Sequence, residues 1–198
     1  MSSIALILTL FVVLYPPTNL ELTERAVTEA CSGLPSQLKA SSIDTLSLQM
    51  EGNHQGGWLV DQTAVSLLTE EGLTIMGSTS EENSYPILKL RPMDLGVRYG
   101  DVSRAWLVGT KKVERVASCE LSATALDAHG HVLMSVRLSA TVSDEVPHSD
   151  LSRLAGSEQE TWLGSGIPEE GGTSLLEPLV VSGVVASLIY LFYSSRAE

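Results

Sequence analysis

Hydrophobic and polar residues form three patterns along this chain: apolar runs at both ends, helical periods inside them, and alternation in the second half. The C-terminal run, Leu179–Tyr193, holds fifteen residues and no charge. As a helix it measures about 23 Å, and it approaches the ~30 Å of a bilayer core when Leu175 and Leu176 are included. The pattern predicts a transmembrane helix over residues 178–193; the alternative is a buried helix of a globular core.

The N-terminal run, Ile4–Tyr15, is twelve residues long and ends at Pro16-Pro17. A helix of that length measures about 18 Å, which is too short to cross a bilayer but suits the apolar region of a secretory signal. Residues 1–17 are therefore predicted to be an export signal or hydrophobic leader. Because Met1-Ser2-Ser3 lacks a basic side chain and no Ala-x-Ala site follows, a misassigned start codon and a short uncleaved anchor stay as alternatives.

Between the two apolar ends, two segments place their apolar residues at helical spacing. They predict a helix over residues 20–34 and a second over residues 58–71. In the second, Val60, Ala64, Leu67 and Leu68 form one apolar stripe. The signals for the ends of the first helix are Asn19 or Thr23 at its start and Gly33 with Pro35 at its stop.

Alternating or short apolar segments predict strands on either side of the second helix, at residues 43–50 and 73–76. The short connections indicate a strand–helix–strand crossover onto one sheet. Residues 85–93 also have an extended pattern, but two prolines within them cannot donate to a ladder. This segment is therefore expected to be an edge strand, followed by a polar loop at residues 95–101.

The strongest local signal is a β-hairpin of residues 113–127 and 131–143 around the dipeptide His129-Gly130. If Ala128 faces His131, the residue numbers of each cross-strand pair sum to 259, and the two faces separate into apolar and polar. A one-residue slip would reverse those faces, so the register is specified. The apolar pairs are Ala125 with Met134, Ala123 with Val136, Leu121 with Leu138 and Cys119 with Ala140; the polar pairs are Glu120 with Ser139 and Ser122 with Arg137.

These elements predict an α+β fold: a mixed sheet with helices on one face, ending in the hairpin, plus the C-terminal transmembrane helix. A chain of 198 residues suits one such domain, expected at residues 20–154. Residues 155–177 are rich in Gly and Glu and predict a flexible acidic linker. Residues 194–198 form a short tail.

Several local motifs of the domain resemble a known family. Gly57-Trp58-Leu59-Val60-Asp61 opens the second helix, Glu71-Gly72-Leu73 closes it, and the segment Leu121–Asp127 precedes Gly130-His131-Val132-Leu133. Over residues 43–143 the chain resembles the α/β domain of bacterial envelope lipoproteins, typified by the curli secretion-channel lipoprotein and the penicillin-binding-protein activators. It departs from them in its C-terminal hydrophobic segment and in having no lipidated N-terminal Cys. The resemblance implies a non-catalytic envelope domain.

Charge is unevenly distributed along the chain. The formal net charge of −12 argues against nucleic acid as a partner, because phosphate binding needs clustered Lys and Arg. Residues 89–115 hold seven basic and three acidic side chains, whereas the rest of the chain holds five basic and twenty-one acidic ones. This segment is a candidate contact for anionic headgroups or an acidic partner; the alternative is ordinary exposed strands paired with acidic neighbours. Its basic residues are Lys89, Arg91, Arg98, Arg104, Lys111, Lys112 and Arg115.

We find no catalytic or cofactor motif, and we expect no catalytic, metal or cofactor site. His129 and His131 flank a turn glycine, and Asp127 and Cys119 share their hairpin, but no further ligand follows at a metal-binding spacing. A solvated turn is the simpler interpretation. Cys31 and Cys119 form no Cys-x-x-Cys pair, which excludes zinc-ribbon and thioredoxin-like sites. An oxidising compartment permits a disulfide between them; the alternative is two buried apolar side chains.

The flanks of the predicted transmembrane helix indicate its orientation. Arg196 follows the helix and no basic residue lies between Trp162 and Leu179, so the tail is expected in the cytoplasm and the domain outside. Small residues on one helix face allow close packing with another helix, which suggests self-association or a membrane partner; lipid-facing small residues are the alternative. These small residues are Ser182, Gly183, Ala186 and Ser187.

Three functional hypotheses follow from the sequence. The first is a non-catalytic protein of the bacterial cell membrane whose exported α+β domain, facing the periplasm or exterior, serves as an interaction or assembly module. The second is a membrane-anchored domain that binds a lipid or small ligand. The third is an enzyme with dispersed site residues.

Overall fold

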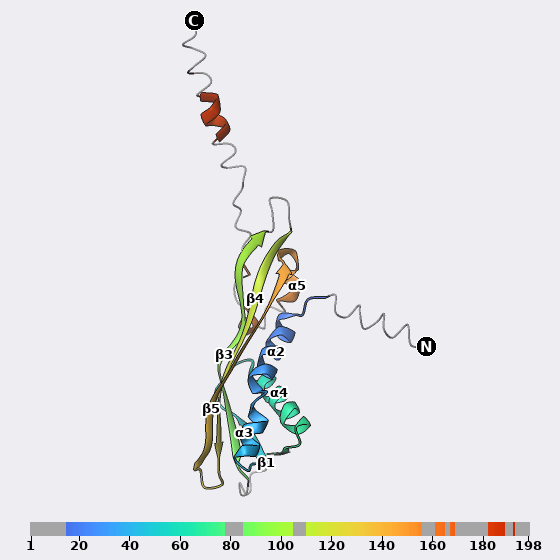
Figure 1. Ribbon diagram of the computed structural model, residues 1–198, viewed down its shortest axis with the longest axis vertical. Coiled ribbons are helices and arrows are strands. Elements are labelled where there is room, and N and C mark those ends of the chain that lie inside the picture. The colour runs from blue at the N-terminus through green and yellow to red at the C-terminus, as the bar shows by residue number, and fades with distance from the viewer. Residues whose placement is uncertain are drawn as a thin grey trace, which may run out of the picture. The chain divides into compact units, whose positions relative to one another are not determined.

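The computed structural model describes residues 15–77, 85–104, 110–155, 161–164, 167–168, 182–188 and 192. The chain divides into two units, Met1–Pro168 and Glu169–Glu198. The first unit contains a five-stranded sheet with the order β2-β1-β3-β4-β5 (Figure 1). Its strands are β1 (Thr45–Met50), β2 (Thr74–Met76), β3 (Ile87–Arg104), β4 (Lys111–Leu126) and β5 (Val132–Pro147).

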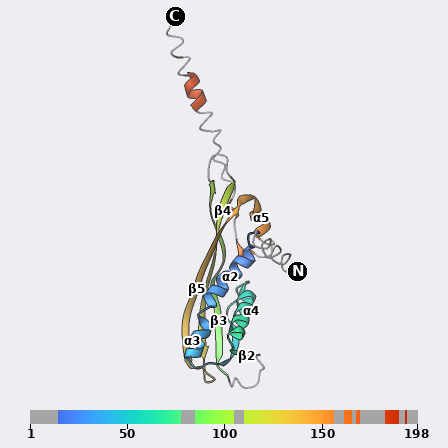
Figure 2. The same ribbon diagram turned by 45° about the vertical axis from the view of Figure 1, so that its right-hand side comes forward.

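The sheet is mixed, as the sequence predicts. β1 runs parallel to both β2 and β3, whereas β3, β4 and β5 form an antiparallel meander. Helix α4 (Gly57–Glu70) connects the parallel strands β1 and β2, which confirms the predicted strand–helix–strand crossover. The helices α2 (Asn19–Cys31) and α4 lie on the same side of the sheet in both views (Figures 1 and 2). The α+β fold is thus confirmed.

Helix α2 begins at Asn19, one residue before the predicted start, and neither predicted cap, Asn19 or Thr23, is its cap. Thr18 is the cap, and it forms a reciprocal capping box with Glu21, in which each side chain accepts a hydrogen bond from the other residue's backbone N–H. Helix α2 ends at Cys31, close to the predicted stop at Gly33, and a separate helix that was not predicted, α3 (Leu34–Ala40), follows. Pro35 lies in the first turn of α3, where its missing N–H costs no helical hydrogen bond.

The register of the β4–β5 hairpin is confirmed. All six predicted cross-strand pairs occur, and the odd-numbered residues of β4 are buried from Val113 to Ala125. The tip differs from the predicted two-residue turn, because the register shifts between Ala125 and Leu126. The Asp127 carbonyl accepts a hydrogen bond from the Gly130 N–H, and the Asp127 N–H donates to the His131 carbonyl; Gly130 has φ 83°. These bonds describe a three-residue loop in which glycine takes the left-handed conformation.

The edge-strand and loop predictions for residues 85–101 are wrong. β3 lies in the middle of the sheet and continues through the expected loop to Arg104. The expectation that proline lacks a ladder partner holds only at Pro92. β1 ends opposite Leu90, so Pro92 lies where one side of β3 has no neighbouring strand. A register shift between Pro92 and Asp94 accommodates the break in the ladder with β4.

The apolar side chains divide into two clusters. The larger lies between the helices and the sheet, where α2 contacts both β4 and β5. Alanines at 117, 123 and 125 of β4 are at most 1% exposed there, in keeping with a close approach of this helix. Beyond β1, only β3, β4 and β5 continue. There, η1 (His148–Asp150) is followed by the short helix α5 (Leu151–Leu154), whose leucines form the smaller cluster with Val113 and Val146.

In the second unit, residues 182–188 are helical and their side chains are exposed. Most of the predicted transmembrane segment, Leu179–Tyr193, lies outside the described residues. Among the residues that the structure describes, no helix is long and apolar enough to cross a membrane.

Candidate functional site

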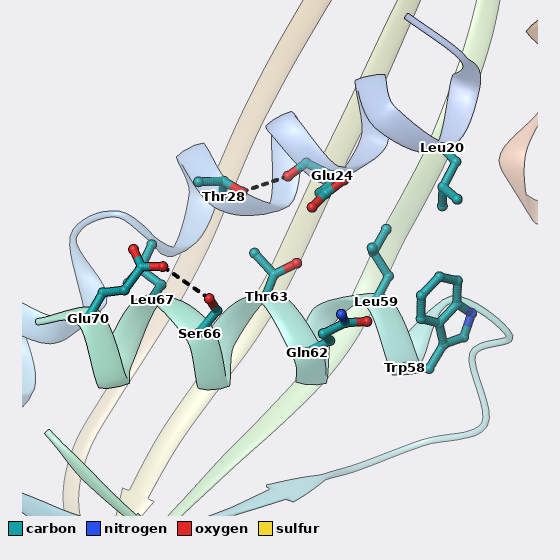
Figure 3. A pocket seen from close by; sticks show the side chains of 10 residues that line it. All are labelled: Leu20, Glu24, Thr28, Trp58, Leu59, Gln62, Thr63, Ser66, Leu67 and Glu70. Carbon is teal, nitrogen blue, oxygen red and sulfur yellow. Dashed lines mark hydrogen bonds between the residues drawn. The ribbon is translucent and has the colours of Figure 1, made fainter.

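A groove of about 340 Å³ lies between α2 and α4, and it is here called the α2–α4 groove. On each helix the lining residues are spaced four positions apart, and those of α2 face those of α4 across the groove, as Figure 3 shows. Its apolar members are Leu20, Leu59, Leu67 and Trp58. Its polar members are Glu24 and Thr28 of α2, and Gln62, Thr63, Ser66 and Glu70 of α4.

Trp58 is the large apolar side chain that the fold leaves uncovered at this groove. It is 49% exposed, whereas the neighbouring Leu59 is 4% exposed. The predicted stripe on α4 is confirmed: Val60, Ala64 and Leu68 are buried, and Leu67 packs against the core while also lining the groove. The sequence held a signal for this second face, because α4 carries more apolar residues than one stripe can contain.

The groove is acidic at both helices. Among the described residues, neither Glu24 nor Glu70 has an ion pair; Glu70 accepts a hydrogen bond from the Ser66 hydroxyl at 3.2 Å. Within the part of the chain that the structure describes, no basic side chain lines the groove. A ligand that fits here therefore needs an apolar surface for Trp58 and a positive charge for the carboxylates.

The seven basic residues predicted as one contact face are divided between environments. Lys89, Arg98 and Lys112 form exposed or half-exposed ion pairs with Glu51, Asp94 and Glu145. Arg91 is exposed, and no ion pair or hydrogen bond joins its side chain to a described residue. By register, Lys89, Arg91, Arg98 and Lys112 share the sheet face that points away from the helices. Lys111 is half-buried, and the side chain of Arg104 lies outside the described residues.

Arg115 points to the opposite face and is not exposed at all. Its Nε and Nη2 donate to the two carboxylate oxygens of Asp144 at 3.0 and 2.6 Å. Nη1 donates to Asn19 Oδ1 at 2.9 Å, and Nη2 also donates to the Pro17 carbonyl at 2.7 Å. We call this set the Arg115 network. A buried guanidinium with these partners is satisfied, so Arg115 cannot serve as a surface contact.

The Arg115 network continues through Asn19 into the C-terminal part of the domain. The Asn19 amide donates to Tyr99 Oη at 2.7 Å and to the Leu163 carbonyl at 3.3 Å. Leu163 is fully buried, and Trp162 packs against the larger core. Residues 161–164, which include η2 (Thr161–Leu163), are called the strap below. They belong to the segment predicted as a flexible linker, yet here they are attached to the domain.

The histidines at the hairpin tip form a solvated turn. His131 Nδ1 lies 2.9 Å from Asp127 Oδ2, and Asp127 also accepts hydrogen bonds from the backbone N–H groups of His129 and His131. These bonds lower the pKa of the Asp127 carboxyl, the His131 side chain being the largest cause. Cys119 lies in the core, away from the tip. Within the described ranges, no group of His, Cys, Asp or Glu side chains is arranged to hold a metal ion.

Both cysteines are free thiols in the core. Burial raises the pKa of Cys31 to about 11. Burial, followed by the charges of Cys31 and Asp94, raises the pKa of Cys119 to about 12. Thiolates are scarce at neutral pH under these conditions, so both side chains behave as small apolar groups.

The four small residues predicted to pack in the membrane lie on the helical segment of the second unit. The Ser187 hydroxyl donates to the Gly183 carbonyl at 2.8 Å, one turn earlier in the same helix. Ser182 and Ala186 are likewise four residues apart and exposed.

The chain is similar to several solved structures, but not to any protein family or curated sequence that it was compared with. A minor lipoprotein from Acinetobacter baumannii is 17% identical, with a TM-score of 0.37, over 57% of this chain and 77% of that chain. A Helicobacter pylori protein described as a homolog of the neuraminyllactose-binding hemagglutinin is 11% identical, with a TM-score of 0.33, over 52% and 64%. At such scores the likeness says nothing about this chain's activity or partners.

Proposed function

We propose that the protein is a non-catalytic, membrane-anchored component of the bacterial envelope whose exported domain is an interaction module. The observation that carries the proposal is the α2–α4 groove, with a half-exposed Trp58 and carboxylates that lack ion pairs. Large aromatic side chains in partly enclosed sites are frequent anchors of protein interfaces. The partner segment that suits the groove is an amphipathic helix with a basic face, bound in the helix-in-groove manner.

Charge outside the groove favours the same partner. The exposed surface of α2 carries Glu21, Glu24 and Glu29 with a single cation, Arg25, and the α4 helix has acidic but no basic residues. This layer therefore attracts a cationic segment and repels an acidic one. The alternative of a small-ligand site has less support, because the groove is partly open to solvent rather than enclosed.

The binding test uses the full chain in zwitterionic detergent micelles and two labelled eighteen-residue amphipathic peptides, one of Leu and Lys and one of Leu and Glu. Fluorescence anisotropy should show binding of the Lys peptide alone. Trp58→Ala should weaken it by about 2 kcal/mol, roughly thirtyfold, as loss of an anchor does. Glu70→Gln should weaken it by a few-fold, and Glu71→Gln should not, because Glu71 pairs with Lys39 beside α3.

Two results would contradict the interaction proposal. Equal binding of the two peptides would show adsorption by apolar contact without the proposed selectivity. Equal effects of Glu70→Gln and Glu71→Gln would show that general charge, and not the groove, attracts the peptide.

Membrane attachment is the second part of the proposal, and it rests on the apolar segment Leu179–Tyr193. Deleting residues 178–198 should move the protein from the membrane fraction to the soluble fraction. A reporter fused to the C-terminus should be protected from external protease while the domain is cleaved, which would place residues 194–198 in the cytoplasm. Sequencing the N-terminus of the same material decides whether residues 1–17 are removed. A digested reporter beside a protected domain would reverse the proposed orientation.

A further inference from the structure

The sheet face that points away from the helices carries a row of cationic and hydroxyl side chains. Arg91 of β3 is the register partner of Ser122 on β4, and Ser122 is the partner of Arg137 on β5. Neighbouring strands are about 4.8 Å apart, so the two arginine Cα atoms lie roughly 10 Å from each other with the serine between them. Each guanidinium reaches far enough to meet an ion placed above Ser122.

A second row lies beside the first and adds further donors. Lys89 is opposite Thr124, and Thr124 is opposite Ser135, with 3.4 Å between the two hydroxyl oxygens. All of the first row and Ser135 of the second line a hollow of about 420 Å³, together with Met93 and Val136. Met93 follows Pro92 at the register shift of β3 and is 49% exposed. The bulge thereby adds an apolar wall to a polar hollow.

The charges around the hollow are not balanced. Lys89 pairs with Glu51 at 2.8 Å, and Arg137 pairs with Glu120. Arg91 has no such partner among the described residues, so three cations and two carboxylates leave one positive charge. Arg137 is 69% exposed and has five N–H donors, only part of which Glu120 occupies.

From this arrangement we infer that the hollow is a binding site for a phosphate group. Two guanidinium groups and the hydroxyls of Ser122 and Ser135 line the same hollow, and a tetrahedral anion offers more acceptor oxygens to them than a carboxylate does. Met93 suits the apolar or sugar portion of a phosphate ester. The site is on the opposite face of the sheet from the α2–α4 groove and is independent of the function proposed for that groove.

The test is a calorimetric titration of the full chain, in zwitterionic micelles, with inorganic phosphate against chloride at matched ionic strength. Saturable binding of phosphate is expected, and Arg91→Gln should weaken it at least about tenfold, the effect of losing a charged hydrogen-bond donor. Arg98→Gln removes the same charge from the same face of β3, outside the hollow, and should change the affinity less than about twofold.

A second pair of variants tests the competition for Arg137. Glu120→Gln releases its guanidinium and should tighten phosphate binding by about fivefold, the value of one close charge in water. Glu145→Gln removes a carboxylate that pairs with Lys112 at 3.5 Å and should leave the affinity nearly unchanged. No saturable binding, or equal effects of Arg91→Gln and Arg98→Gln, would overturn the inference.

The source of the phosphate is distinguished by two further ligands, glycerol phosphate and a short-chain phosphatidylglycerol below its micelle concentration. If the lipid binds more tightly than glycerol phosphate, and Met93→Ser removes that difference, the site takes a lipid headgroup. If the two bind alike, it takes a water-soluble phosphate ester. Trp58→Ala should leave every one of these affinities unchanged, so failure here and failure of the groove proposal are separate results.

Discussion

In the five-stranded part of the sheet, β4 buries Ala123 and Ala125 toward the helices, whereas in the three-stranded part the same face of the same strand buries Arg115. The first region is held by apolar contacts in a cluster that includes α2, α3 and α4. The second has only a small apolar cluster around Leu151 and Leu154, and a network of hydrogen bonds beside it.

One region buries apolar side chains and the other buries hydrogen-bonded polar groups, because different parts of the chain cover them. α2 and α4 present apolar side chains to the five-stranded part. The three-stranded part is covered instead by the entry to α2 and by the strap, which contribute the Pro17 and Leu163 carbonyls and the Asn19 side chain. Buried carbonyls need donors, and Arg115 and Asn19 supply them.

The apolar region and the Arg115 network differ in what they contribute: the first stabilises the fold, and the second positions chain segments on it. Apolar contacts are non-directional and stabilise the fold without fixing where a chain segment leaves it. The Arg115 network is directional, and it holds the segment before α2 and the strap against the same part of the sheet. Along the sequence, one segment follows the N-terminal apolar run and the other precedes the C-terminal one. We therefore expect the Arg115 network to fix the points at which the chain enters and leaves the domain.

The largest effect is expected from Asp144→Ala. It leaves Arg115 buried with half of its hydrogen bonds and no counter-charge, which typically costs about 3–5 kcal/mol. The free energy of unfolding, from urea titration of the full chain in micelles, checks the value. In hydrogen exchange, the backbone amides of Val113 and Val146 should lose more of their protection than that of Leu121.

An apolar replacement of the pair is the control for this prediction. Arg115→Met with Asp144→Leu should recover only part of the loss, because the Pro17 carbonyl and Asn19 Oδ1 lose their donor. Complete recovery would show that the network adds nothing beyond filling space. The comparison between the two regions would then be wrong.

Alkaline pH should affect the larger apolar cluster, where both thiols are buried. Their pKa values are raised from the ordinary 9.0 to about 11 and about 12, so the folded protein keeps protons that the unfolded chain has lost. The stabilisation is complete below pH 9 and is lost as the pH rises toward the folded values. Each thiol lowers the free energy of unfolding by about 1.4 kcal/mol per pH unit between pH 9 and 11.

The difference between the wild-type chain and a Cys31→Ala, Cys119→Ala variant isolates this contribution, since Tyr and Lys titrate in both. Urea titrations at pH 8, 9, 10 and 10.5 should converge as the pH rises. Parallel pH profiles would mean that the thiols are not shielded from solvent in the fold. Slow alkylation of the native thiols at pH 8 is the supporting measurement.

Gly96→Ala should detach the strap at a cost of about 1–3 kcal/mol. Gly96 has φ 153°, and a Cβ there would lie 2.5 Å from the Trp162 carbonyl oxygen. Gly100, in the same strand, has room for a Cβ and no positive φ, so Gly100→Ala is the matched control. Limited proteolysis should cleave near Leu163 faster in the first variant alone. Equal cleavage of both would show that contact with Gly96 does not hold the strap.

Sequence alone predicted the parts of the fold that local rules determine. The hairpin register followed from alternation, because a shift of one residue would have exposed Leu121 and Leu138 together. The crossover followed from the order of elements and short connections. The hairpin tip was missed by one residue, since His129-Gly130 alone does not distinguish a two-residue turn from a three-residue loop with glycine at its last position.

The parts that depend on distant partners were not predicted. Because of its two prolines, the segment that forms β3 was predicted to be an edge strand. The neighbours of a strand depend on the whole fold, however, and only Pro92 lies where β3 has no neighbouring strand on one side. Arg115 read as one of seven surface cations, because its partners lie 29 to 98 positions away in the sequence. The groove was missed for the same reason: it exists only once α2 and α4 pack side by side.

The smallest effect is expected from Glu145→Ala, next to Asp144 on the same strand. Glu145 pairs with Lys112 at 3.5 Å, and the two side chains are 61% and 52% exposed. Water solvates both charges and salt screens them, so loss of the pair should cost between about 0 and 1 kcal/mol and should vanish in 1 M salt. Adjacent carboxylates of equal charge thus differ several-fold in their effect on the free energy of unfolding, because one faces the buried Arg115 and the other faces solvent. Similar losses for the two variants would mean that charge in this region, and not burial of the Arg115 network, holds the three-stranded part together.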